Sequence, residues 1–142
     1  MIAFLDSSAI VKTYLRWESG REAFERLVDS SVQLAVSRFT YVEVRSALAA
    51  ARRAGRLSPS EHDRAVESFD MAWKTYAIVE LDEPIGKRAG SIAETFGLRS
   101  GDAVQLASAL ALDGDTTVIV AWDLSLRMAG QSAGVPVYPA VI

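Results

Sequence analysis

The chain contains no cysteine and only one histidine, His62, among its 142 residues. Without cysteine it can form no disulfide, no thiolate nucleophile and no cysteine-ligated zinc site. A single histidine leaves no second imidazole for a metal cluster or a catalytic relay. Any catalytic chemistry must therefore rely on oxygen ligands.

Long apolar runs are also missing, since none approaches the ~18 residues that span a membrane. The opening Met-Ile-Ala-Phe-Leu-Asp has no basic leader and reaches an acid at position 6, which is unlike a signal peptide. We therefore expect a cytoplasmic protein without membrane contact. With 50% hydrophobic and 23% charged residues and no low-complexity tract, residues 1–142 are expected to form a single globular domain.

Short apolar runs alternate with helical patterns, which is typical of a parallel sheet covered by helices. Strands are predicted at residues 2–5, 33–36, 77–81, 117–121 and 135–138, and helices at 7–15, 20–30, 39–56, 100–112 and 124–131. The sequence thus predicts an α/β fold, a three-layer α/β/α sandwich whose mainly parallel sheet has about five strands.

Two further helices carry clear start signals. Ser58-Pro-Ser-Glu61 is a capping box followed by aromatic and apolar residues at helical spacing, namely Val66, Phe69, Trp73 and Tyr76. Asp82 and Pro84 open the next helix, and Gly97 is suited to a left-handed cap at its end. The apolar stripe of that helix comprises Ile85, Ala89, Ile92 and Phe96.

Two acids follow predicted strands. Asp6 and Asp123 each end an apolar run and precede a helix, so they lie where open α/β sheets bind ligands. Each could also serve only as the N-cap of the helix that follows. Their position alone leaves both interpretations open.

Glu43 lies in the middle of a helix. At ~100° per residue it is predicted to project among Phe39, Ala47, Ala50 and Ala54, away from Arg45, Arg52 and Arg56. A lone acid on an apolar face is costly unless it finds a partner or a ligand. This favours a functional role for Glu43.

Asp102 lies in the first turn of its helix, where the helix dipole favours a negative charge. It also heads the apolar stripe of Leu106, Ala109 and Leu110, which directs it toward the sheet. The four acids could therefore converge at one sheet edge. Because converging carboxylates repel one another, such a site needs cations, and oxygen ligands favour Mg²⁺ or Mn²⁺. These ions support phosphodiester hydrolysis.

The net charge of −3 argues against nonspecific binding along nucleic acid, so basic groups for such a substrate must be local. Cations near the acids in sequence are Lys12, Arg16, Arg38, Arg45 and Arg99. Each could equally belong to a solvated surface. Ser8 and Ser37 could orient a ligand or water, or simply cap helices.

The order of these segments resembles the PIN-domain ribonucleases, and most closely the VapC-type toxins of toxin–antitoxin pairs. The resemblance rests on Asp6-Ser-Ser-Ala-Ile-Val-Lys12, Ser37-Arg-Phe-Thr-Tyr-Val-Glu43, Leu98-Arg-Ser-Gly-Asp-Ala103 and Ala121-Trp-Asp123. It implies Mg²⁺ or Mn²⁺ at the four acids, endonucleolytic cleavage of RNA, a homodimer and inhibition by a small cognate antitoxin.

The sequence departs from that family at Ala121, where members commonly carry threonine or serine. This residue favours one alternative, a PIN-like module that lacks strong catalysis and binds other proteins. A receiver-type phosphoacceptor domain is a second alternative, but it needs paired acids after the first strand and a late lysine. A haloacid-dehalogenase-like phosphatase needs an Asp at position 8, which is Ser8 here.

Overall fold

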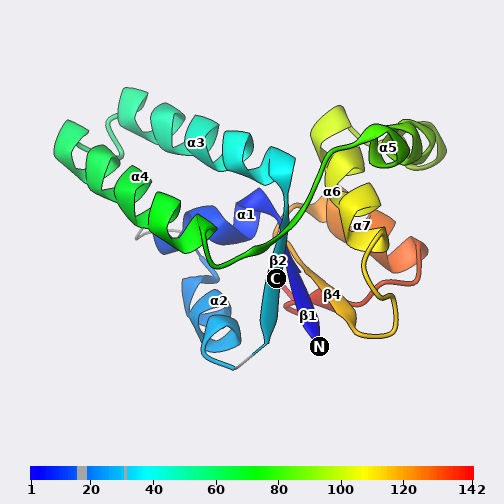
Figure 1. Ribbon diagram of the computed structural model, residues 1–142. Coiled ribbons are helices and arrows are strands. Elements are labelled where there is room, and N and C mark those ends of the chain that lie inside the picture. Colours follow the sequence, from blue (N-terminus) through cyan, green and yellow to red (C-terminus); the bar gives the residue numbers. More distant parts are fainter. Residues whose placement is uncertain (16–18, 31) are drawn as a thin grey trace.

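A five-stranded sheet lies at the centre of the protein, seen here in a computed structural model that describes residues 1–15, 19–30 and 32–142 (Figure 1). Its strands are β1 (Ile2–Leu5), β2 (Gln33–Ser37), β3 (Ala77–Val79), β4 (Thr117–Val120) and β5 (Val137–Tyr138). They are ordered β3-β2-β1-β4-β5, and every neighbouring pair is parallel. The predicted parallel sheet is confirmed.

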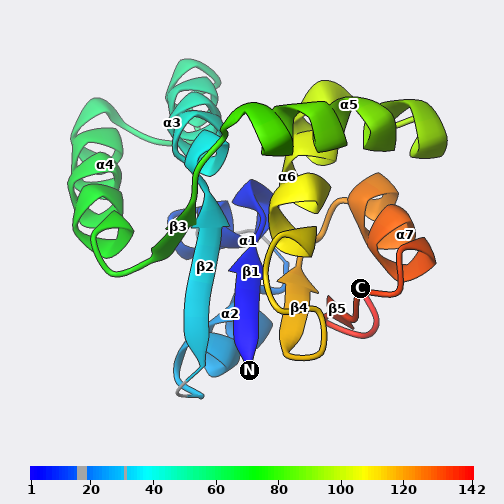
Figure 2. The same ribbon diagram turned by 45° about the vertical axis from the view of Figure 1, so that its right-hand side comes forward.

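Helices cover both faces of this sheet. They are α1 (Ser7–Ile10), the 3₁₀ turn η1 (Val11–Thr13), α2 (Arg21–Val28), α3 (Arg38–Arg53), α4 (Pro59–Trp73), α5 (Glu83–Phe96), α6 (Ser100–Leu110) and α7 (Leu124–Ser132). Figure 2 looks onto the sheet with α6 in front and α2 behind. The predicted three-layer arrangement is therefore present.

The alternation of side chains along β1 divides the core into two halves. Ala3 and Leu5 pack with residues of α1 to α4, whereas Phe4 packs with residues of α5 to α7. All three are fully buried. Successive side chains of a strand point to opposite faces, so both faces of a central parallel strand must be apolar.

Several predicted helix signals are present in the structure. Ser58 and Glu61 form the capping box of α4, and Asp82 caps α5 by accepting a hydrogen bond from the Ile85 N–H at 3.0 Å. Gly97 ends α5 with φ of 64°. Phe96, predicted on the apolar stripe of α5, is instead 36% exposed because it lies at the last turn, beyond the packed part of the helix.

Some predicted boundaries are wrong. The first helix was expected to run over residues 7–15, but α1 ends at Ile10 and continues as η1. The β-branched Val11 and Thr13 have low α-helix propensity, which favours this change. Likewise α3 ends at Arg53, because Gly55 turns the chain with φ of 73°.

The parallel arrangement brings the carboxyl ends of the strands to one edge, the upper edge in Figure 2. There β1, β2 and β4 lead into α1, α3 and α7, and the N-terminal part of α6 packs against α3. This edge is where open α/β sheets place their sites. Among the described residues, no helix is both long and apolar enough to cross a membrane.

Candidate functional site

Asp6 is a buried acid at the carboxyl end of β1. It is 3% exposed and caps α1, with Oδ2 accepting a hydrogen bond from the Ser8 backbone N–H at 3.1 Å. Burial raises the pKa of Asp6 to about 6, although hydrogen bonds from Ser8 oppose this shift. Asp6 therefore caps α1, but its charged form is costly because the carboxylate is buried.

Glu43 extends from α3 toward α6. Its Oε1 accepts a hydrogen bond from Gln105 Nε2. The pKa of Glu43 is raised to about 7, mainly by burial and also by the nearby charges of Asp6 and Asp102, while the Gln105 hydrogen bond opposes the shift. Glu43 is thus placed beside two other acids of the predicted set.

The predicted surroundings of Glu43 are partly wrong. Ala50 and Ala54, expected on its apolar face, are exposed. The buried stripe of α3 instead consists of Thr40, Val44, Leu48 and Ala51. Glu43 lies at the margin of this stripe. Alanine fits either a buried or an exposed position, so an alanine-rich helix defines the phase of its buried face poorly.

Asp102 lies in the first turn of α6, and its side chain is 13% exposed. Its Oδ2 is buried and has no hydrogen-bond partner in the described structure. Arg99 Nε lies 3.6 Å from this oxygen, close enough for attraction but too far for a hydrogen bond. Burial and then the Asp123 charge raise the pKa of Asp102, and Arg99 lowers it.

Asp123 follows β4 and caps α7, with Oδ1 accepting a hydrogen bond from the Leu126 N–H at 2.9 Å. Its other oxygen, Oδ2, lies 3.8 Å from Arg99 Nη2. The Arg99 side chain, which is 83% exposed, therefore lies near both Asp102 and Asp123. Its guanidinium is the cation that the structure places at this pair of acids.

The four acids form a connected set at the sheet edge. Electrostatic repulsion links Asp6 to Asp102 and to Glu43, Glu43 to Asp102, and Asp102 to Asp123. Among residues 1–15, 19–30 and 32–142, however, no group of three or more Asp, Glu, His or Cys side chains stands ready to hold a metal ion together. The oxygen-only donor set and the unpartnered Asp102 Oδ2 fit a hard divalent cation.

The two serines have structural partners. Ser8 Oγ accepts a hydrogen bond from the Trp122 backbone N–H at 3.0 Å, next to Asp123. Ser37 is fully buried and caps α3, with Oγ accepting from the Phe39 N–H at 3.2 Å. Ser8 thus links two strand ends of the site, whereas the Ser37 hydroxyl caps α3.

The basic side chains near the acids in sequence do not share one environment. Lys12 is 4% exposed, with Nζ 4.8 Å from the centre of the Trp122 ring. Arg38 pairs with Glu80, and Arg45 donates to Tyr41 Oη at 2.7 Å. Arg16 lies outside the described residues. Arg99 lies at acids of the predicted site, with Asp102 and Asp123 both within 4 Å of its guanidinium.

Sequence reasoning missed Gln105 and Gly101. Gln105 is fully buried and holds Glu43, and a Cβ built on Gly101 would lie 3.1 Å from Glu43 Oε2. The sequence carried a signal for Gln105, because this amide interrupts the apolar residues of α6 three positions after Asp102. A polar side chain in an apolar stripe requires a hydrogen-bond partner.

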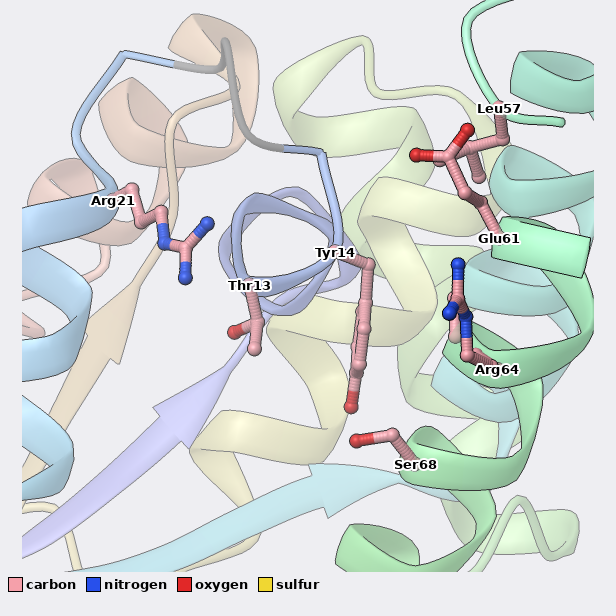
Figure 3. A pocket seen from close by; sticks show the side chains of 8 residues that line it. Thr13, Tyr14, Arg21, Leu57, Glu61, Arg64 and Ser68 are labelled. Carbon is pink, nitrogen blue, oxygen red and sulfur yellow. The ribbon is translucent and has the colours of Figure 1, made fainter.

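A separate pocket of about 290 Å³ lies between η1, α2 and α4, and none of the four acids lines it. Figure 3 shows Tyr14 extending toward Ser68, with Arg21 and Arg64 on opposite sides of the pocket. Arg21 is paired with Glu25 through Nε and Oε1 at 2.7 Å. The pocket is thus distinct from the carboxylate edge.

Comparisons with known proteins agree with this arrangement. Ribonuclease VapC45 of Mycobacterium tuberculosis is 38% identical over 139 residues, covering 98% of this chain and 96% of the relative. A toxin–antitoxin complex from Klebsiella pneumoniae has a chain with TM-score 0.62 and 19% identity, covering 88% of this chain and 89% of that one. FitAcB from Neisseria gonorrhoeae gives TM-score 0.67 and 21% identity, covering 96% of each chain.

The two structural neighbours are under 25% identical and so establish the fold alone. The family follows from the sequence comparisons. The family model of the PIN domain matches residues 3–123, a span that includes all four acids. The resemblance found in the sequence is therefore confirmed, and this chain belongs to the PIN domain family.

Proposed function

We propose that the chain is a metal-dependent endoribonuclease and the toxin of a type II toxin–antitoxin pair. The observation that carries this proposal is the connected set of carboxylates at the sheet edge, in which Asp6 is buried, the other three are half-buried, and Asp102 Oδ2 has no hydrogen-bond partner among the described residues. The named ribonuclease relative supports the activity. Family membership leaves the receiver-type and phosphatase-like alternatives without support.

In this proposal Asp6, Glu43, Asp102 and Asp123 hold Mg²⁺ or Mn²⁺. The chemistry that such an ion supplies when bound is activation of water and stabilisation of charge on the scissile phosphate. The protein's part is to gather the carboxylates in a partly buried setting, where their mutual repulsion is costly and favours a cation. Arg99, exposed beside Asp102 and Asp123, provides a guanidinium for a substrate phosphate.

The proposed partners are an RNA substrate, a small cognate antitoxin and a second copy of this chain, in the cytoplasm. The neighbour described as a toxin–antitoxin complex supports the antitoxin. One observation favours the alternative of a weakly catalytic interaction module. Ala121 is fully buried, and its backbone is hydrogen-bonded to Arg127 and Tyr138. Its side chain is a methyl group, so this position offers no hydroxyl to the site.

Cleavage of structured RNA tests the proposal. Purified protein freed of any bound inhibitor should cut RNA internally with Mg²⁺ or Mn²⁺ and stop in EDTA, and Asp6→Asn should abolish cleavage. Asp82→Asn is the matched control, because Asp82 caps α5 and belongs to no acid cluster described here. Equal cleavage in EDTA would contradict the metal mechanism, and no cleavage under any condition would favour the interaction module.

A further inference from the structure

Gln105 is a buried amide on a mainly apolar face of α6. It is fully buried on α6, among Ala103, Leu106, Ala107 and Ala109. Burying an amide costs free energy unless each polar atom is hydrogen-bonded. The contacts of Gln105 therefore explain why a polar side chain is tolerated here.

The amide nitrogen of Gln105 makes both of its hydrogen bonds to α3. Nε2 donates to Glu43 Oε1 and to Thr40 Oγ1, the latter at 2.9 Å. The Thr40 hydroxyl is itself fully buried and lies 3.2 Å from Gln105 Oε1. Thr40 therefore contacts both polar atoms of the amide, and the amide in turn restrains one carboxylate oxygen of Glu43.

The second oxygen of Glu43 lies close to the same helix. A Cβ at Gly101 would lie 3.1 Å from Glu43 Oε2, so the absence of a side chain leaves the space that this oxygen uses. Gly101 and Gln105 are four residues apart, on one face of α6. Between them they bracket the Glu43 carboxylate, Gln105 at Oε1 and Gly101 at Oε2.

We propose that Gln105 is a positioning residue that holds the Glu43 carboxylate for the divalent cation of the site. The inference rests on the proposed function and deepens it. By engaging Oε1, the amide restricts rotation of Glu43 and would hold its carboxylate in place for the cation. Residues that orient a metal ligand in this way contribute strongly to metal affinity, although they do not touch the ion.

The test compares Gln105→Met with Gln105→His. Methionine keeps the length of the side chain but has no donor, whereas the histidine Nε2 is as many bonds from the backbone as the Gln105 nitrogen. Ser108→Ala is the matched control, because Ser108 is buried on the same helix and donates only to Val104 O at 2.8 Å. Melting temperature is measured against Mn²⁺ concentration, and RNA cleavage at saturating Mn²⁺.

We expect Gln105→Met to raise the Mn²⁺ concentration for half-maximal thermal stabilisation on the order of tenfold. In Gln105→His this Mn²⁺ concentration should lie within about threefold of the parent value, and in Ser108→Ala it should equal the parent value. If Gln105→Met does not fold, Thr40→Val carries the test, with an expected increase of about threefold because it only frees the amide to rotate.

Suppose that the parent binds Mn²⁺ and cleaves RNA. If Gln105→Met then responds to Mn²⁺ and cleaves RNA as the parent does, the role of Gln105 is overturned while the proposed function stands. The same holds for Thr40→Val if it replaces Gln105→Met. Equal losses in Gln105→Met and Ser108→Ala would also overturn the role of Gln105, since they indicate general damage to α6. A parent that neither responds to Mn²⁺ nor cleaves RNA contradicts the proposed function itself, and the inference with it.

Discussion

The hydroxyl of Ser8 accepts a hydrogen bond from the backbone N–H of Trp122 at 3.0 Å, across 114 positions of the sequence. This bond ties the first turn of α1 to the segment after β4. Asp6 and Asp123 lie on the two sides of it, one just before Ser8 and one just after Trp122. The alignment of these two acids therefore depends in part on one side chain.

Replacing Ser8 tests this link. Ser8→Ala removes the acceptor of the Trp122 N–H, so we expect a loss of about 1 kcal/mol in the free energy of unfolding, measured by urea denaturation. Ser91→Ala is the control, because its exposed hydroxyl donates only within α5, and its effect should stay within about 0.5 kcal/mol. Equal effects of the two changes would contradict a role for the Ser8 link.

The raised pKa values predict how metal-free stability depends on pH. Asp6 titrates at about 6 and Glu43 at about 7 in the folded state, above the usual 3.8 and 4.5. At pH values between the unfolded and the folded pKa of each group, the folded protein binds more protons than the unfolded chain. The contribution of Asp6 and Glu43 to the free energy of unfolding is therefore greatest at acid pH and falls as the pH rises through their folded pKa values. Thermal melts in EDTA at about pH 5 and about pH 8 measure this dependence.

Glu43→Gln removes one of the two groups and should flatten that profile. The informative quantity is the difference between the parent and Glu43→Gln curves, because other carboxylates titrate in both proteins. Two parallel curves would mean that burial does not raise the pKa of Glu43 in solution.

Asp102→Asn separates a functional cluster from isolated helix caps. In EDTA it should melt at or above the parent temperature, because it relieves repulsion among the acids and removes the charge from a carboxylate whose buried Oδ2 has no hydrogen bond in the described structure. The parent should gain about 2.7 kcal/mol from Mn²⁺ at a hundredfold excess over the dissociation constant, and Asp102→Asn much less. A destabilised Asp102→Asn with an unchanged Mn²⁺ response would support the capping interpretation.

Two glycines inside helices form a matched pair. Gly90 in α5 faces open space, so Gly90→Ala should stabilise the protein by about 0.5–1 kcal/mol through helix propensity. The Cβ of Gly101→Ala would press on Glu43 Oε2 at 3.1 Å. We expect a smaller gain or a loss of stability there, with cleavage reduced about tenfold by the displaced carboxylate. Identical behaviour of the two variants would contradict the close approach of Glu43.

Much of the architecture follows from local patterns in the sequence. Apolar runs and helical spacing predict the parallel sheet. As expected, the capping box at Ser58 begins α4 and Gly97 ends α5. Asp6 and Asp123 could be placed at strand ends for the same reason, since chain order along a parallel sheet determines which residues reach its carboxyl edge. The lack of cysteine and the single histidine limited the chemistry to oxygen ligands.

Only the tertiary structure decided how these side chains meet. The contact between Gln105 and Glu43 joins positions 62 residues apart, and Arg99 lies near two acids from separate segments, Asp102 in α6 and Asp123 after β4. A helical pattern predicts which face is apolar to within about one residue, or 100°, which is too coarse to orient Glu43 on the alanine-rich α3. The raised pKa values of Asp6, Glu43 and Asp102 likewise depend on burial and on neighbouring charges that distant segments supply when they pack.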